Sequence, residues 1–284
     1  MDILAHVLQT AGLRKRILVE KRCEGPWSFD FPCGQSFGFH VVIEGRMTLH
    51  TETLERELLA GDIAFMRRGC HHQLSVASGQ SAYVVNGAYQ LWHDPMHFLF
   101  QDLPRWHFLT AQERRYGNPI QQCLGLLSAE VEQKEEAAAG VKAALLDLLF
   151  HYIFREISAE TPGYWQKTLE EPLVLAALKC MHQQPEVSWS VESLAQQVGL
   201  SRSGFSNRFK AATGETPLKY LTALRMSLAM RALSEGDETL TAIAHQVGYN
   251  DVFAFSKAFK RRVGQAPQHF RQQEKDSQQL SWRF

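Results

Sequence analysis

The chain has 284 residues, of which 45% are hydrophobic, and its 30 Lys+Arg balance its 30 Asp+Glu. This composition excludes a largely disordered chain, and the length favours two domains. No apolar run approaches the ~18 residues of a membrane span, and the N-terminus lacks the features of an export signal. We therefore expect a cytoplasmic protein with no membrane partner, and the scattered cysteines, which form no CxxC pair, fit a reducing compartment.

The zero net charge conceals an asymmetry along the chain. Upstream of Leu173 there are 16 Lys+Arg against 21 Asp+Glu, a net charge of −5, and from Leu173 onward there are 14 against 9, a net charge of +5. Such a separation of sign suggests that the rear part meets a polyanion.

From about Arg14 to His97 the sequence carries short β-type runs separated by Gly, Pro and Ser. The runs are FGFHVVIEG, MTLHTE, DIAFMRR, HQLSVA and SAYVVNGAY. Runs of this length that are rich in β-branched and aromatic residues predict strands. Together they predict a small antiparallel sandwich or barrel.

Beyond about Asn118 the apolar residues recur at helical spacing. The run VKAALLDLLFHYIFREIS is apolar over most of its surface, which predicts burial against another helix or a partner chain. The pattern breaks in SAETPGYWQKTLEEP, so we place a linker between Ser158 and Pro172.

The rear part contains an internal repeat. SLAQQVGLSRSGFSNRFKAATGETPLKYL begins at Ser193, and AIAHQVGYNDVFAFSKAFKRRVGQAPQHF begins at Ala242. The first half of the unit recurs at an offset of 49 residues and, after one inserted residue, the second half recurs at an offset of 50. Matches in both registers indicate two copies of one structural unit.

Each copy predicts a short helix that ends at a glycine, a turn, and a second helix that Ser201 or Asp251 can cap. In each second helix two phenylalanines are four residues apart, so they point to one side. This is the layout of a helix-turn-helix, whose second helix enters the major groove of DNA. The alternative, in which each helix pair only packs against its neighbours, does not account for the cations that follow each aromatic pair.

The outward residues of the second helices are therefore the candidate DNA contacts. Side chains early in each helix are expected to contact base edges, and the cations that follow are expected to contact phosphates. The set comprises Arg202, Ser203, Ser206, Asn207, Lys210, Asn250, Phe253, Ser256, Lys257, Lys260, Arg261 and Arg262.

The stretch from Trp189 to Arg271 resembles the DNA-binding region of the AraC-type (AraC/XylS) transcription regulators, with LTALRMSLAMRAL as the helix that joins the two units. The resemblance implies an all-α domain over residues 173–284 that meets successive major grooves of double-stranded promoter DNA, about 34 Å apart. The sequence departs from the family pattern at Asn207, where Arg is common, and at Asp251-Val252, where Ser-Glu is common. Because Asn can contact adenine, we expect a changed base preference.

The front part resembles the cupin-like sensor domain of some of these regulators, through GPWSF, FHVVIEGRMTL, LLAGDIAFMRRGCHHQL and FLFQDLPRWHFL. The resemblance implies a β-barrel with a helical extension over residues 1–160, and so an α+β fold for the chain. Cupins often bind a metal, but here the first three ligand positions fall near Phe31, Cys33 and Gly38, and only His72 remains. We therefore expect no metal, no cofactor and no catalytic residue, with His40, His71 and His72 as hydrogen-bonded barrel residues.

A barrel without metal ligands can still enclose an apolar ligand or shield a reactive thiol. The candidate effector pocket comprises Cys23, Trp27, His40 and His72. Some relatives carry a redox-sensing cysteine at the position of Cys23, but Asn86 occupies the usual partner position in VVNGAY. Cys33 and Cys70 are alternatives, although each is more typical of a buried small side chain.

We predict a transcription regulator rather than an enzyme, whose front domain senses a small molecule or an oxidant and controls DNA binding or activation. The alternative is a cupin-type binding protein or enzyme with an accessory helical domain. The apolar helices around CLGLLSAEVEQ and ALLDLLFHYIFREI either cover the barrel or form a subunit interface. We expect a homodimer formed through the front part, with RNA polymerase as a further partner.

Overall fold

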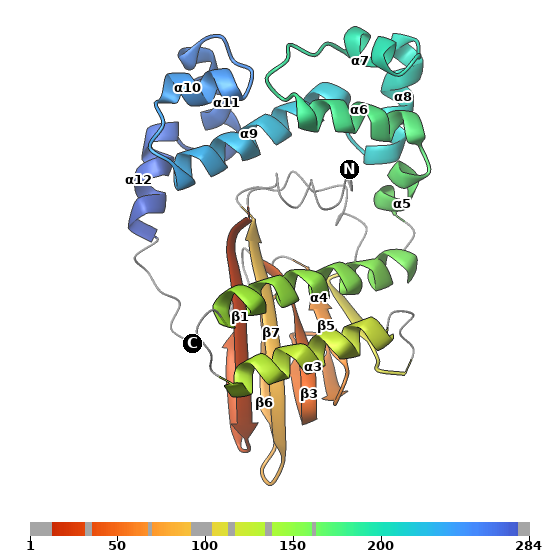
Figure 1. The fold of residues 1–284 in the computed structure, drawn as a ribbon, viewed down its shortest axis with the longest axis vertical. Coiled ribbons are helices and arrows are strands. Elements are labelled where there is room, and N and C mark those ends of the chain that lie inside the picture. The colour runs from red at the N-terminus through yellow and green to blue at the C-terminus, as the bar shows by residue number, and fades with distance from the viewer. Residues whose placement is uncertain are drawn as a thin grey trace. The chain divides into compact units, whose positions relative to one another are not determined.

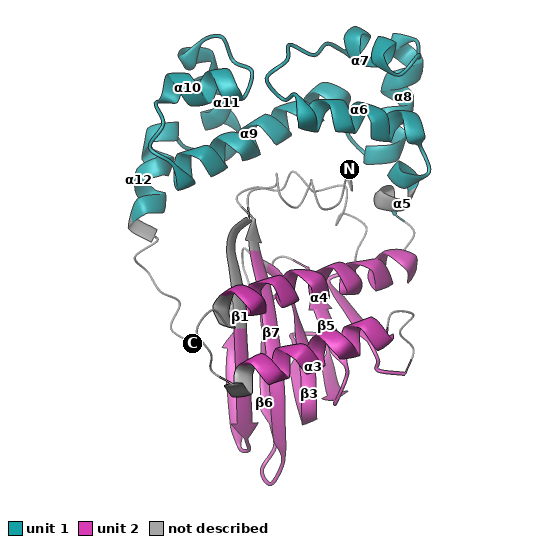
Figure 2. Ribbon diagram, in the orientation of Figure 1, with its two compact units in different colours: residues 1–14, 91–101, 163–284 teal, residues 15–90, 102–162 magenta. Residues whose placement is uncertain are grey.

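The computed structural model describes residues 13–31, 36–67, 70–91, 104–112, 117–133, 138–160 and 163–277. They form two compact units (Figure 2). We call the described residues within 15–90 and 102–160 the barrel unit and residues 163–277 the helical unit. Cys33 lies outside the described residues.

The barrel unit is an antiparallel sheet built around one long strand. Its described strands are β1 (Leu13–Glu24), β2 (Trp27–Phe31), β3 (Ser36–His50), β4 (Glu55–Leu59), β5 (Ile63–Met66), β6 (His72–Val76), β7 (Ser81–Leu91) and β8 (Trp106–Leu109). The first half of β3 pairs with β5 and β7, and its second half pairs with β4 and β6. Because β3 contributes to both sets of strands, it joins them into one cupin-like body.

A bulge lets β3 change partners. The register with β7 shifts between Val42 and Glu44, and Gly45 follows with a φ of 73°. A Cβ atom at Gly45 would lie 1.9 Å from the carbonyl oxygen of Ser81, so only glycine fits there. The sequence runs FGFHVVIEG and MTLHTE are therefore two halves of one bent strand rather than two strands.

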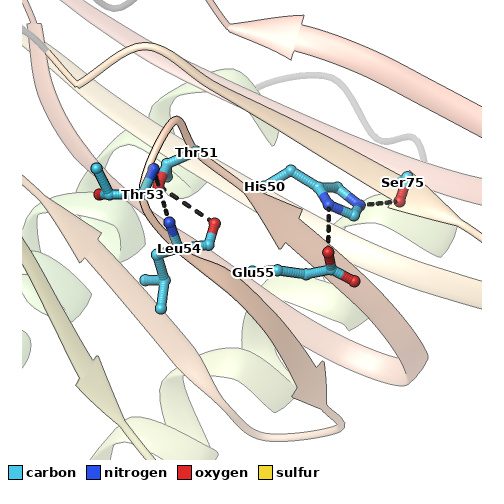
Figure 3. Close-up of polar contacts among 6 residues, drawn as sticks. All are labelled: His50, Thr51, Thr53, Leu54, Glu55 and Ser75. Carbon is cyan, nitrogen blue, oxygen red and sulfur yellow. Dashed lines mark hydrogen bonds and ion pairs between the residues drawn. The ribbon is translucent and has the colours of Figure 1, made fainter.

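The turn between β3 and β4 is fixed by side chains (Figure 3). The Thr51 hydroxyl oxygen accepts hydrogen bonds from the backbone N–H groups of Thr53 (3.3 Å) and Leu54 (2.9 Å). Beside the turn, the His50 ring lies 2.8 Å from Ser75 Oγ on β6 and 3.6 Å from a Glu55 carboxylate oxygen. These contacts hold the register in which His50 pairs with Glu55.

Two helices, α3 (Gly117–Gln133) and α4 (Ala138–Glu160), pack against each other, and α4 also packs against the sheet. The Tyr89 hydroxyl of β7 donates to the Leu146 carbonyl of α4, and the Phe37 ring of β3 lies 5.4 Å from the Phe150 ring. Figure 1 shows both helices on the same side of the strands. Along the apolar run ALLDLLFHYIFREI of α4, Leu148 is exposed, whereas six large apolar residues are buried within the barrel unit: Leu145, Leu146, Leu149, Phe150, Ile153 and Phe154.

The helical unit consists of α5 (Tyr164–Leu169), α6 (Pro172–Gln183), α7 (Val191–Gln197), α8 (Arg202–Thr213), α9 (Pro217–Glu235), α10 (Leu240–Gln246), α11 (Val252–Val263) and α12 (Pro267–Ser277). The pairs α7/α8 and α10/α11 are the two predicted helix-turn-helix units, and α9 runs between them (Figure 1). The α+β fold, with a cupin-like sheet and a helical region, is confirmed.

The segment expected to be a linker is partly helical. α4 continues to Glu160, and α5 forms between residues 164 and 169. The Thr168 hydroxyl donates to the carbonyl of Ala212 on α8, and both groups are buried. α5 therefore packs as part of the first helix-turn-helix unit, a tertiary contact that the local pattern of Pro, Gly and Thr did not reveal.

Candidate nucleic-acid interface

The first unit holds α8 by a buried aromatic stripe and a defined start. Phe205 and Phe209 are 0% exposed, and their rings lie 5.6 Å apart. The Ser201 hydroxyl accepts from the Gly204 N–H at 3.2 Å, which is the predicted N-cap. Gly199 closes the preceding helix at a φ of 69°, as the glycine in the turn predicted.

The second unit repeats this construction with a charged cap. Phe255 and Phe259 are 0% exposed and pack in a core with residues of α9 and α10. The Asp251 carboxylate accepts from the N–H groups of Phe253 (3.2 Å) and Ala254 (2.8 Å). The negative charge at the helix N-terminus also interacts favourably with the helix dipole and stabilises α11. Gly248 takes a φ of 78° in the turn.

The predicted contact residues are largely accessible to a partner. Ser206 and Ser256 are half-buried, and the other ten are exposed: Arg202, Ser203, Asn207, Lys210, Asn250, Phe253, Lys257, Lys260, Arg261 and Arg262. Each set is thus presented by a helix whose other side is anchored in an aromatic core. Such a surface can contact the floor and walls of a major groove.

The two outward faces differ in charge. On α8, Arg202 forms an ion pair with Glu192 of α7 at 2.8 Å, and Arg208 lies 3.7 Å from Glu171. On α11, the four cations Lys257, Lys260, Arg261 and Arg262 form no ion pair with another described residue. The second unit therefore offers more uncompensated positive charge to phosphates.

Arg225, which the sequence reasoning missed, contacts both helix-turn-helix units. Its guanidinium projects from α9 and donates to the carbonyls of Pro185 (2.7 Å) and Val187 (2.8 Å), which precede α7. It also lies 5.8 Å from the centre of the Tyr249 ring, in the turn before α11. The signal available in the sequence was an arginine within the largely apolar run LTALRMSLAMRAL, which also carries Arg231. Arg225 is thus placed to hold the two units in one arrangement.

The barrel unit brings two of the predicted pocket residues into contact. His40 pairs with Asn86 across β3 and β7, and its Nδ1 lies 2.6 Å from Asn86 Oδ1. The Nε2 atoms of His40 and His72 are 2.6 Å apart. The His72 Nδ1 donates to the Cys70 carbonyl at 2.7 Å, and the Phe31 ring stacks on His72 at 5.0 Å.

Burial sets the protonation of this pair. Desolvation, together with repulsion from His72, lowers the pKa of His40 from 6.5 to about 3, although its hydrogen bond to Asn86 opposes that shift. Desolvation also lowers the pKa of His72 to about 4, although its hydrogen bond to Cys70 opposes that shift. Burial therefore favours the neutral form of each imidazole and opposes protonation of both together.

The pair does not fit a metal ion of the kind that cupins often hold. The two Nε2 atoms face each other at hydrogen-bond distance, and no group of three or more His, Cys, Asp or Glu in the described part of the chain could hold a metal. Cys23 and Trp27 lie in and against the barrel's apolar core, with Phe31 and Trp106 packed against the same cluster. His71, unlike its neighbour, is exposed.

Two helix-turn-helix pairs, each with an anchored second helix and an outward cationic face, define a DNA-binding protein. Comparison with known proteins identifies the family within this class. Residues 194–273 match the family model described as a helix-turn-helix domain, and residues 2–159 match the model described as a cupin. The chain belongs to the AraC-type transcription regulators that carry an N-terminal cupin domain.

Similar proteins extend over nearly the whole chain. A putative AraC-like transcription regulator of Streptomyces lividans is 27% identical over 95% of this chain and 98% of its own length. The HTH-type transcriptional regulator AlkR of Acinetobacter baylyi is 29% identical over 96% and 100%. The RCS-specific HTH-type transcriptional activator RclR of Escherichia coli is 27% identical over 96% and 98%. No helix in the described ranges has the length and hydropathy to cross a membrane.

Proposed function

We propose that this regulator binds a specific promoter site through α8 and α11, and that the barrel unit controls this binding in response to a small molecule. The observation that carries the first part is the division of each second helix into a buried aromatic side and an exposed polar side. That division leaves the predicted contact residues available to a groove. The proposed role is regulatory rather than catalytic. The proposed location is the cytoplasm, where the protein has access to its promoter.

Fluorescence anisotropy of the full chain on fragments of its own promoter tests the DNA part. We expect tight binding to one fragment, with an affinity that falls steeply as salt rises. Asn207→Ala should cost roughly 1–3 kcal/mol on that fragment and relax the preference at one or two base pairs. Lys260→Ala, the control, should weaken binding to all fragments alike. Equal affinity for promoter and random duplex at every salt concentration would contradict the proposal.

The barrel interior supports a small-molecule effector better than an oxidant. Burial raises the pKa of the Cys23 thiol and raises that of Cys123 to about 11, so both carry little reactive thiolate. The Cys70 thiol is buried and lies 3.3 Å from the Arg105 carbonyl. By contrast, the His40–His72 pair is bordered by the rings of Phe31 and Trp106, a combination of polar and aromatic groups that suits an organic ligand.

Thermal unfolding of the full chain separates these two effectors. The probes are a panel of small carboxylic acids, amides and alcohols on one side, and hydrogen peroxide on the other. A ligand of the native barrel raises the unfolding midpoint, and the rise grows with the logarithm of its concentration once this exceeds Kd. We expect a rise with a member of the organic panel that His72→Gln removes. A response to peroxide alone would favour the oxidant.

We also propose a homodimer formed through the barrel unit, although burial of most of α4 narrows the surface available. Leu126 on α3 and Val141 and Leu148 on α4 remain 58%, 43% and 44% exposed. Light scattering of the full chain should give a dimer at tens of micromolar, and Leu126→Glu with Leu148→Glu should convert it to a monomer. Leu59→Glu, at an equally exposed leucine of β4, is the control. A wild-type monomer would contradict this part.

The name of one relative includes the words transcriptional activator. We propose that this chain also activates transcription, with RNA polymerase as its partner at the promoter. Transcription in vitro from the bound promoter should rise when the protein is added; a fall would make it a repressor.

A further inference from the structure

Phe253 is an exposed aromatic side chain that the fold leaves without a packing role. It is 81% exposed, the highest value among the large exposed hydrophobic residues of the described chain. Burying a phenylalanine contributes roughly 1.5–3 kcal/mol, so a partner that covers Phe253 would gain from the contact. Phe253 is the second residue of α11, the helix whose outward face carries the cations.

The position of Phe253 around α11 points it away from the core. At about 100° per residue, Phe255 and Phe259 lie roughly 200–240° around the helix from Phe253, on the buried side. Lys257 and Lys260, at four and seven residues further on, lie within roughly 40° of Phe253. The aromatic ring therefore leads a face whose later residues are phosphate-binding cations.

The cap of α11 determines which part of DNA this tip can approach. The Asp251 carboxylate already accepts from the N–H groups of Phe253 and Ala254. A helix start with occupied N–H groups and a negative charge repels phosphate rather than binding it. The first turn of α11 is thus better suited to base edges than to the backbone.

The matched residue in the other unit has the opposite chemistry. At the offset of 50 residues, Phe253 corresponds to Ser203, and Lys257 corresponds to Asn207. Ser203 and Asn207 can hydrogen-bond to base edges, whereas a phenyl ring can only make apolar contact there. The apolar group that base edges offer in the major groove is the C5 methyl of thymine.

We propose that Phe253 contacts thymine methyl groups in the half-site bound by α11, so that the two units recognise bases by different chemistry. The first unit uses hydrogen bonds from α8, and the second uses apolar contact from the tip of α11. This assignment rests on the proposed binding of promoter DNA through α8 and α11.

Replacement of thymine by deoxyuridine tests the proposal, because it removes only the C5 methyl and keeps pairing and the O4 acceptor. Each thymine of the bound promoter fragment is replaced in turn, and the full chain is titrated by anisotropy. We expect one or two positions in one half-site at which wild-type affinity falls by about three- to tenfold. Phe253→Ala should bind the thymine site with about the same loss and no longer distinguish deoxyuridine from thymine.

Two further variants make the outcome decisive. Phe253→Leu should keep part of the deoxyuridine effect, and Ser203→Ala, the matched control, should keep all of it. Specific binding without any deoxyuridine-sensitive position would overturn the methyl contact and leave promoter binding intact. So would a Phe253→Ala variant that binds more weakly yet still distinguishes deoxyuridine, which would indicate a wedge between bases or a protein contact. Loss of specific binding to every duplex would instead remove the proposed function itself.

Discussion

The barrel unit and the helical unit differ in where their candidate functional residues lie. In the barrel, Cys23, His40 and His72 are at most 6% exposed. In the helical unit, ten of the twelve predicted contact residues are exposed and the two serines are half-buried. The contacts of a buried polar group form on folding, so its replacement changes stability. Replacement of an exposed group changes mainly the binding of a partner that contacts it. Substitutions should therefore change stability and pH response in the barrel, and binding without stability on the outward faces of the helices.

The largest effect is expected inside α11, where a buried and an exposed phenylalanine are two residues apart. Phe255→Ala removes a fully buried ring and should lower the free energy of unfolding by about 3–5 kcal/mol. Phe253→Ala should change it by less than about 0.5 kcal/mol. Urea unfolding of the two variants checks this, and similar losses from both would show that the outward face is wrongly assigned.

The pair of matched turn glycines should show the next effect. Both Gly199 and Gly248 have positive φ, which costs an alanine about 1–2 kcal/mol. A Cβ atom at Gly199 meets nothing within 4 Å, whereas one at Gly248 would lie 2.6 Å from an Arg225 guanidinium nitrogen and 2.8 Å from the Glu186 carbonyl oxygen. Gly248→Ala should therefore cost roughly 1–3 kcal/mol more than Gly199→Ala in urea unfolding. Equal losses in the free energy of unfolding would argue against the close packing of Arg225 between the two helix-turn-helix units.

The sequence predicted the helical unit well because its signals are local. The turn glycines, the caps Ser201 and Asp251 and the paired phenylalanines each act within a few residues, and the repeat shows them twice. The barrel's central contact is not local. His40 and His72 meet because β3 pairs with both β5 and β7 in its first half and with β6 in its second, a register set by the bulge before Gly45. Arg225 was missed for the same reason, since its partners lie about 40 residues away in sequence.

Acid should act on the barrel through the histidine pair. In the unfolded chain each histidine titrates near its ordinary pKa of 6.5, whereas burial holds the folded values at about 3 and about 4. The stability of the folded barrel is therefore not reduced by these histidines above pH 6.5. It falls as the pH drops from 6.5 toward 4, because in that range only the unfolded chain takes up protons. The loss should be about 1.4 kcal/mol per pH unit for each histidine.

Urea unfolding at pH 7 and pH 5.5 measures this slope. His72→Gln should remove about one histidine's share of it, whatever its effect on stability at pH 7. His71→Gln alters the adjacent but exposed histidine and should leave the slope nearly unchanged. A wild-type slope equal to that of His72→Gln would mean that the pair is not held neutral by burial.

The smallest effect is expected at the cations, and it concerns salt rather than stability. Arg262→Ala should lower the slope of log affinity against log salt by about 1 and weaken binding to all duplexes alike. Arg202→Ala should change the slope less, because Arg202 is already paired with Glu192. Arg56→Ala, at an exposed cation of the barrel, should leave it unchanged. An unchanged slope in Arg262→Ala would move the phosphate contacts away from the end of α11.

Methylation interference on the bound promoter tests most directly whether two helices of one chain contact the major groove. Guanine N7 methylation blocks that groove, so it marks each position at which a helix enters it. Binding by both α8 and α11 predicts two clusters of interfering guanines on one face of the duplex, separated by about one helical turn of 10–10.5 base pairs. Asn207→Ala should weaken one cluster and Phe253→Ala the other. A single cluster, or two that respond together to either variant, would contradict recognition by two separate helices.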